Sequence, residues 1–209
     1  KSDEFDLLPF DSPYIEEQVQ RQAPGAAVHL QTIEAYGGGF PWSTYILARH
    51  LPAKKMTALD RCATTLLATA HRSLHYHFEA LCVLKAFDEM RMEPLLPIYP
   101  KFARRRWGYA ACRQVRQRLV ETTLVCYSAD AGAYVIDEPL RLVLEARLYV
   151  RDFDLWKELH CVAYRLYASW AAAYQQSRKW WTREEQYHQR CLQQAGLDPA
   201  HCPPPVGSK

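Results

Sequence analysis

The chain has 209 residues, of which 49% are hydrophobic and 23% charged, and its formal net charge at pH 7 is +3. This composition is typical of a globular protein and excludes an intrinsically disordered chain. No apolar run is long enough to cross a bilayer, so we expect no transmembrane segment. The charge is uneven, because residues 101–118 carry seven positive and no negative charges, which leaves a net charge of −4 on the rest.

Residues 1–50 contain four prolines and the glycine triplet at 37–39, so they give no long helical pattern. Several of their first residues are nevertheless too apolar for a free linker. We therefore predict an extended N-terminal arm over residues 1–50, which packs on its own core or on a partner, with one short helix at 43–50. The chain begins without a methionine, which would follow from removal of a targeting peptide or from an arbitrary boundary.

Residues 51–176 show the spacing of amphipathic helices, with apolar side chains recurring every three or four positions. The pattern predicts a helical core domain there. The expected helices cover residues 57–74, 78–90, 103–126, 140–148 and 155–173. Residues 177–209 add a C-terminal helix, which starts at a capping box of Thr182 and Glu185 and is followed by a proline-rich tail. The prediction is an all-α protein, an irregular stack of helical hairpins with about six helices and no strand.

Seven cysteines are present, an odd number, at wide spacings. Most of them lie within the helical patterns rather than in a compact cysteine framework. We therefore predict reduced, buried thiols in a reducing compartment.

Residues 80–99, "ALCVLKAFDEMRMEPLLPIY", resemble the second helix and exit of a pentatricopeptide repeat. In that family the "FDEM" run would sit near the end of the helix, and Pro97 would open the turn to the next repeat. The resemblance implies a single degenerate helical hairpin. No second copy follows at the period of about 35 residues that a repeat array requires, so no RNA-reading residues are transferred from the family.

The segment "KFARRRWGYAACRQVRQR" at 101–118 interleaves aromatic residues with its seven cations. Arginine forks suit phosphate oxygens, and aromatic rings stack on exposed bases. We predict an RNA-binding helix face made of Lys101, Arg104, Arg105, Arg106, Trp107, Arg113, Arg116 and Arg118. The alternatives are an interface with an acidic protein or a lipid surface, and an ordinary solvated face whose aromatic residues belong to the core.

The segment "SRKWWTREE" repeats the combination of cations and aromatic residues. Two adjacent tryptophans cannot easily face one core, and tryptophan is favoured at binding hot spots. We predict a partner-binding cluster of Arg178, Lys179, Trp180 and Trp181. The alternative is that both tryptophans cover the end of the helical stack.

The segment "HRSLHYH" places His71 and His75 four residues apart, with His77 nearby. Such a pair can hold zinc, but the glutamate of HExxH is missing and no further ligand completes a site by spacing. The chain also lacks a G-x-S-x-G motif and a phosphate-binding loop. We therefore predict no catalytic residue, no metal and no cofactor, and we expect the protein not to be an enzyme.

Together these features resemble an accessory protein of a mitochondrial ribosome. We expect a non-catalytic subunit of a large ribonucleoprotein in the mitochondrial matrix, with rRNA and neighbouring protein subunits as its partners. The first alternative is an accessory subunit of a respiratory-chain or ATP synthase complex, whose arginines meet acidic subunits or lipid head groups. The second alternative is a metal-dependent enzyme that uses the three histidines of "HRSLHYH".

Overall fold

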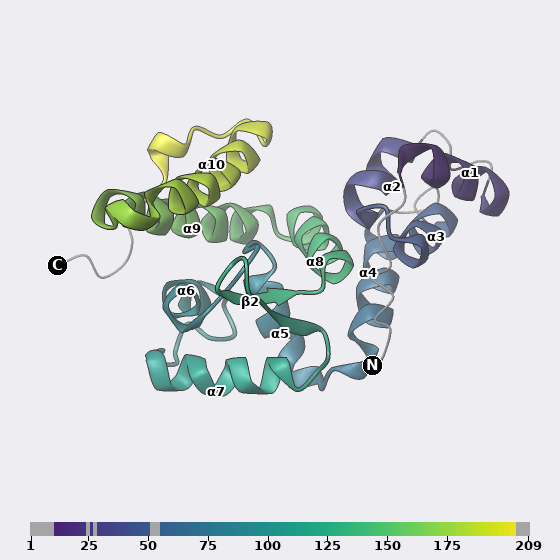
Figure 1. The fold of residues 1–209 in the computed structure, drawn as a ribbon. Helices are drawn as coiled ribbons and strands as arrows, with labels where there is room; N and C mark the ends of the chain where they lie inside the picture. Colours follow the sequence, from purple (N-terminus) through teal and green to yellow (C-terminus); the bar gives the residue numbers. More distant parts are fainter. Residues whose placement is uncertain (1–10, 24–25, 27–28, 51–54, 204–209) are drawn as a thin grey trace. The chain divides into compact units, whose positions relative to one another are not determined.

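The computed structural model of the chain describes residues 11–23, 26, 29–50 and 55–203 (Figure 1). Helices dominate these residues, which form ten α-helices and one two-stranded sheet. The prediction of an all-α protein is therefore confirmed in its broad form, although the number of helices exceeds the expected six. Among the described residues, no helix combines the length and the apolar character that a membrane crossing requires.

The chain divides into two compact units, residues 1–69 with 137–151, and residues 70–136 with 152–209. This division differs from the predicted one, because each unit combines segments from distant parts of the sequence. Each unit is described here by itself.

The first unit contains helices and no strand in its described residues. It contains α1 (Ser12–Gln22), α2 (Leu30–Gly37), α3 (Pro41–His50), α4 (Lys55–Leu66), the short 3-10 helix η2 (Leu67–Thr69) and α8 (Glu138–Arg151). Helix α3 packs against α1, α2 and α4, and α8 packs against α2 and α4. The buried residues that hold these helices together include Ile15, Val19, Ile33, Leu47, Leu59, Cys62, Leu140, Val143 and Leu144.

The predicted extended arm is wrong over residues 12–22 and 30–37, which are helical, whereas the short helix predicted at 43–50 is confirmed by α3. Pro13 and Pro41 lie in the first turns of α1 and α3, where a missing N–H costs nothing, so they start helices rather than break them. Gly38 ends α2 in the left-handed conformation with a φ of 58°. The first ten residues, which carried much of the argument for an arm, lie outside the described residues.

The second unit contains all the residues predicted to bind RNA or a partner. Its elements are α5 (Arg72–Leu81), α6 (Glu89–Leu95), the 3-10 helix η3 (Leu96–Ile98), α7 (Tyr109–Val120), β1 (Val125–Ser128), β2 (Ala133–Ile136), α9 (Phe153–Ala173), η4 (Gln175–Ser177), α10 (Arg178–Gln194) and η5 (Pro199–His201). Helices α9 and α10 lie side by side as a hairpin, and α6 packs against both α7 and α9 (Figure 1).

Two predicted helices are shorter than expected. The helix expected at 78–90 ends at Leu81, and Phe87 instead pairs with Tyr134 in an isolated β-bridge before Asp88 caps α6. The helix expected at 103–126 covers only Tyr109–Val120. It stops before Thr122 and Thr123, because β-branched residues disfavour a helix and Thr123 takes a positive φ of 61°.

The missed sheet is an antiparallel hairpin in which Val125 pairs with Ile136 and Ser128 pairs with Ala133. The stretch "SADAG" at 128–132 forms the turn of this hairpin, with Gly132 in the left-handed region at a φ of 58°.

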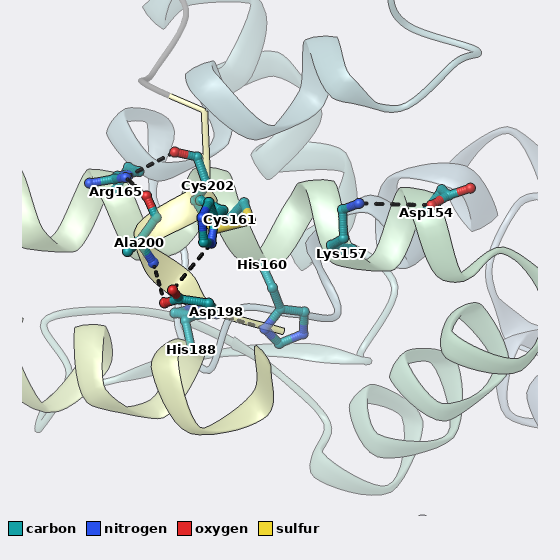
Figure 2. The surroundings of a disulfide bond; sticks show 10 residues. Asp154, Lys157, His160, Cys161, Arg165, His188, Asp198, Ala200 and Cys202 are labelled. Carbon is teal, nitrogen blue, oxygen red and sulfur yellow. Dashed lines mark hydrogen bonds and ion pairs between the residues drawn. A yellow bond between two sulfur atoms is a disulfide. The ribbon is translucent and has the colours of Figure 1, made fainter. Parts of the chain in front are cut away.

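The cysteines differ from the prediction at one pair. Cys161 on α9 and Cys202 after η5 form a disulfide, and Arg165 donates hydrogen bonds to the backbone carbonyls of Ala200 and Cys202 beside it (Figure 2). Cys62, Cys82 and Cys112 are buried and form no disulfide, as expected, and burial raises the pKa of the Cys62 thiol to about 12. The prediction of reduced thiols throughout is therefore wrong, because sequence spacing does not reveal that the chain folds back onto α9.

Candidate nucleic-acid interface

The basic segment consists of a compact turn followed by helix α7. Residues 101–105 form the turn, in which Phe102 N–H donates to the Tyr99 carbonyl and Arg105 N–H donates to the Phe102 carbonyl. Gly108 is the N-cap of α7. The three consecutive arginines at 104–106 therefore precede the helix, and only Arg113, Arg116 and Arg118 lie on it.

Two aromatic side chains anchor this turn to the unit. Phe102 and Trp107 are each only 9% exposed, and their ring centroids lie 5.4 Å apart in an edge-on contact. The Trp107 indole N–H also donates to the Phe102 carbonyl over 3.2 Å. Trp107 is thus a buried anchor, which corrects its prediction as an RNA contact. Tyr109, at 59% exposure, is the aromatic residue that faces solvent among the arginines.

His77 completes the anchor from helix α5. Its ring stacks on Phe102 with centroids 4.4 Å apart, and its Nδ1 donates to the Ser73 carbonyl over 3.1 Å. Burial, together with the nearby charges of Arg105 and Arg118, lowers the pKa of His77 to about 4. The imidazole is therefore neutral at physiological pH.

Six of the seven cations in the segment are exposed: Lys101, Arg104, Arg105, Arg106, Arg113 and Arg118. Three of them rest on neighbouring groups. Lys101 Nζ lies 4.8 Å from the Tyr76 ring centroid, Arg105 Cζ lies 4.5 Å from that of Trp107, and Arg118 donates to Ser73 Oγ over 2.9 Å. We call these six side chains the basic surface.

Three members of the basic surface are available to a ligand without breaking a contact. In the part of the chain that the structure describes, the side chains of Arg104, Arg106 and Arg113 make no hydrogen bond or ion pair. Because the segment contains no carboxylate, these guanidinium groups raise the local positive potential without internal neutralisation.

Arg116 has a different role from the predicted one. Its Nε donates to Glu89 Oε1 over 2.7 Å and its Nη1 donates to the Tyr134 hydroxyl over 2.9 Å. Burial alone would lower the pKa of Arg116, but the hydrogen bond and charge of Glu89, together with smaller contributions from Tyr134 and Tyr109, outweigh burial and the pKa is raised. The side chains of Arg116 and Glu89 are only 16% and 11% exposed, so this ion pair joins α7 to α6 rather than facing RNA.

The predicted partner-binding cluster forms the first four residues of α10. Trp180 and Trp181 are both part-buried and meet edge-on, with ring centroids 4.5 Å apart. Trp181 also packs against Trp170 on α9 at 4.7 Å. Arg178 and Lys179 are exposed. The two tryptophans thus pack over the end of α9 and keep some exposure, and partner binding by this cluster stays a prediction.

Arg91 is the residue of this cluster that the sequence did not reveal. It comes from α6, its side chain is 4% exposed, and its Nη1 forms an ion pair with Asp88 Oδ2 at 2.7 Å. Its Cζ lies 4.9 Å from the Trp180 centroid and 5.2 Å from that of Trp181. No sequence signal separates this arginine from the exposed ones, since only the fold brings α6 to the tryptophans.

Two cavities flank Trp181. One, of about 580 Å³, is mostly apolar and is lined by Asp88, Met90, Trp170, Ala173, Tyr174, Gln175, Gln176, Ser177 and Trp181. The other, of about 600 Å³, contains several cations and is lined by Arg91, Ala129, Asp130, Ala131, Gly132, Gln176, Ser177, Lys179, Trp180, Trp181 and Arg183. We call the second one the basic cavity.

The three histidines considered as metal ligands do not converge. His71 is the N-cap of α5 and accepts from Ser73 N–H, His75 Nε2 bonds to the Ala70 carbonyl, and His77 is the buried ring described above. Their ring nitrogens do not form a cluster with ligand spacing. The structure therefore gives each of them a local role in α5.

No family model matches this chain, and neither a curated protein nor a solved structure is detectably similar to it. The functional argument therefore rests on the residues themselves.

Proposed function

We propose that this protein is a non-catalytic structural subunit of a large ribonucleoprotein and that its basic surface binds the RNA backbone. The observation that carries the proposal is the exposure of six cations on a segment without a carboxylate. Arginine guanidinium groups match phosphate oxygens in pairs, and each such contact releases counterions from the RNA.

The anchoring of this segment supports the proposal. Phe102 and Trp107 fix the turn to the unit, so the cations that follow one another at 104–106 are displayed on a defined backbone. A pre-arranged surface loses less conformational entropy on binding than a disordered basic tail. Tyr109 adds an exposed ring on which an unpaired base can stack.

The assembly that we propose is a mitochondrial ribosome or one of its assembly intermediates, in the matrix, with rRNA and neighbouring proteins as partners. This part of the proposal rests on the sequence features, including the resemblance of residues 80–99 to a pentatricopeptide hairpin. The Cys161–Cys202 disulfide does not support it, because disulfides are rare in reducing compartments.

The same disulfide favours a second candidate function. An accessory subunit of a respiratory-chain or ATP synthase complex, on the oxidising side of its membrane, would retain the disulfide. There the basic surface would meet acidic subunits or anionic lipid head groups.

The salt dependence of RNA binding tests the proposal. The triple variant Arg104→Gln, Arg106→Gln and Arg113→Gln removes three exposed charges that hold no internal contact, so the fold is retained. The slope of log K against log salt concentration is expected to become shallower by about 2 units. The matched control, Arg21→Gln with Arg61→Gln and Arg190→Gln, removes three exposed charges elsewhere and is expected to leave the slope within about half a unit of the wild type.

A fractionation experiment separates the two candidate functions. The native complex is sedimented before and after treatment with ribonuclease. Release of the protein to lighter fractions by ribonuclease supports the ribonucleoprotein. Unchanged sedimentation, together with a triple variant that keeps the wild-type salt slope, rejects RNA binding in favour of the second candidate.

A further inference from the structure

The basic cavity combines positive charge with aromatic walls in one place. Of its lining residues, Arg91, Lys179 and Arg183 are cations and Asp130 is the one carboxylate among those that the structure describes. Lys179 and Arg183 are exposed, whereas Arg91 lies in the wall. Trp180 and Trp181 supply the aromatic surface. A ligand that fits this cavity is an anion with a flat apolar part.

The backbone around the cavity adds to the attraction for an anion. Gln176, Ser177 and the first turn of α10 line one side, and the turn of the β-hairpin at 129–132 lines another. The Arg178 N–H at the start of this 17-residue helix donates to the Gln175 carbonyl of η4, but Ser177, the N-cap of α10, makes no side-chain capping bond to the N–H groups that follow. Helix N-termini favour negatively charged groups, phosphate above all.

One buried donor in the cavity wall has no acceptor. Trp181 Nε1 is inaccessible to solvent and makes no hydrogen bond with any described residue. Buried polar groups are nearly always paired in native proteins, and each exception calls for an explanation. A ligand that carries a hydrogen-bond acceptor into this cavity would supply the missing partner after a small movement of the wall.

We propose that the basic cavity binds one unpaired nucleotide of an RNA strand. The base stacks on the exposed part of the Trp180 indole, and the phosphate contacts Lys179, Arg183 and the N-terminus of α10. Arg91 holds the two tryptophans in position from below, through its contacts at 4.9 Å and 5.2 Å with their rings. That the ligand is RNA rests on the proposed function. That it combines a phosphate with an aromatic base is inferred from the residues that line the cavity.

An unpaired nucleotide fits this chemistry better than a paired one. In an RNA duplex the bases are stacked on one another and the protein meets mostly phosphates and 2′-hydroxyls, so Trp180 would have no base to contact. The basic surface of residues 101–118 contacts phosphates, which single-stranded and duplex RNA both carry, so it can bind both. We therefore expect the basic cavity to prefer single-stranded RNA and the basic surface to bind both kinds.

Binding by the full chain is measured by fluorescence anisotropy with two labelled probes. One is a single-stranded RNA of about 8 nucleotides and the other is an RNA duplex of about 16 base pairs. The variants are Trp180→Leu, which removes the aromatic face, Trp180→Phe, which keeps one, and the pair Lys179→Gln with Arg183→Gln. The matched control, Arg61→Gln with Arg190→Gln, removes two exposed charges that do not line the cavity.

Trp180→Leu and the Lys179→Gln, Arg183→Gln pair are each expected to weaken binding of the single strand roughly tenfold. Trp180→Phe is expected to recover most of that loss, and the control pair to stay within about threefold of the wild type. Binding of the duplex is expected to change less than about twofold in the Trp180 variants, because the duplex does not use this ring.

Two results would overturn the inference. Single-strand binding that depends on Arg104, Arg106 and Arg113 but not on Trp180, Lys179 or Arg183 would reject the cavity and leave the proposed function intact. Binding to vesicles with anionic lipids that requires Lys179 and Arg183, without binding of either RNA probe, would reject both proposals and assign the cavity to a lipid phosphate.

Discussion

Cys161, near the middle of α9, is covalently joined to Cys202, the last cysteine of the chain, across 41 positions of sequence (Figure 2). The segment that follows α10 is therefore fastened to α9. Arg165, one turn further along α9, strengthens this attachment by donating to the carbonyls of Ala200 and Cys202 over 3.0 and 2.9 Å. The hairpin of α9 and α10 is thus closed at both ends, by η4 and by the disulfide.

Removal of this disulfide is expected to destabilise the protein. A crosslink that closes a loop of this length lowers the entropy of the unfolded chain by an amount worth about 4 kcal/mol, and Cys202→Ser should cost roughly 2–4 kcal/mol. Urea unfolding with and without a reducing agent measures the change. Cys126→Ser, at an exposed free cysteine, is the control and should have no effect. An unfolding midpoint that does not respond to the reducing agent would contradict the disulfide.

Arg113 and Arg116 are expected to differ sharply although both were predicted to bind RNA. Arg116→Gln removes the partner of Glu89, which is 8% exposed, and should cost roughly 2–4 kcal/mol of unfolding free energy. Arg113→Gln removes an exposed charge and should change stability by less than about 0.5 kcal/mol while it weakens RNA binding. Urea unfolding and anisotropy on both variants give the comparison. The assignment fails if Arg113→Gln proves the more destabilising change.

The N-terminal helices show why local sequence signals mislead over residues 1–50. Prolines and glycines there predict an irregular chain, yet Pro13 and Pro41 start helices and Gly38 ends one. The effect of a proline or glycine depends on whether it lies at the end or in the interior of a helix. A short helix contains too few apolar repeats for the sequence to show where the helix begins and ends. The long α9 was predictable because its 21 residues repeat the apolar spacing many times.

The candidate site was predictable only in its charges. Composition located the basic segment, but it could not show that Trp107 and Arg116 face inward while Tyr109 and Arg113 face outward. That choice depends on partners such as His77 and Glu89, which lie on α5 and α6, far away in the sequence. The basic cavity was beyond prediction for the same reason, since Arg91 and the turn at 129–132 reach the tryptophans only through the fold.

Gly38 is expected to resist substitution for two separable reasons. Its φ of 58° disfavours any residue with a Cβ, and a Cβ built there would lie 2.5 Å from Leu142 Cδ1. Gly132 has the same φ but open space around it, so Gly132→Ala measures the backbone cost alone, which is about 1 kcal/mol. Gly38→Ala should cost about 1 kcal/mol more than Gly132→Ala in urea unfolding, because Leu142 must also move. Equal costs would mean that Leu142 adapts freely.

His77 is expected to make the protein less stable in weak acid. Its Nδ1 already donates to the Ser73 carbonyl, and its buried Nε2 has no acceptor among the described residues, so a second proton would bring an unpaired charge into the anchor of the basic surface. The folded pKa is about 4, below the ordinary value of 6.5, so the unfolded chain binds the proton more tightly. The contribution of neutral His77 to the unfolding free energy is therefore fully present above pH 6.5, and it decreases as the pH falls towards 4.

The expected loss between these two pH values is roughly 3 kcal/mol, from the difference between the two pKa values. His77→Phe keeps the ring on Phe102 and abolishes the titration, so its unfolding free energy should vary less with pH than that of the wild type over this range. His201→Gln, whose parent side chain is 85% exposed, should retain the wild-type dependence. Parallel pH profiles for wild type and His77→Phe would show that another group governs acid stability. A midpoint of the wild-type loss close to pH 5 would instead tie acid unfolding to the residue that anchors Phe102 and Trp107 beneath the basic surface.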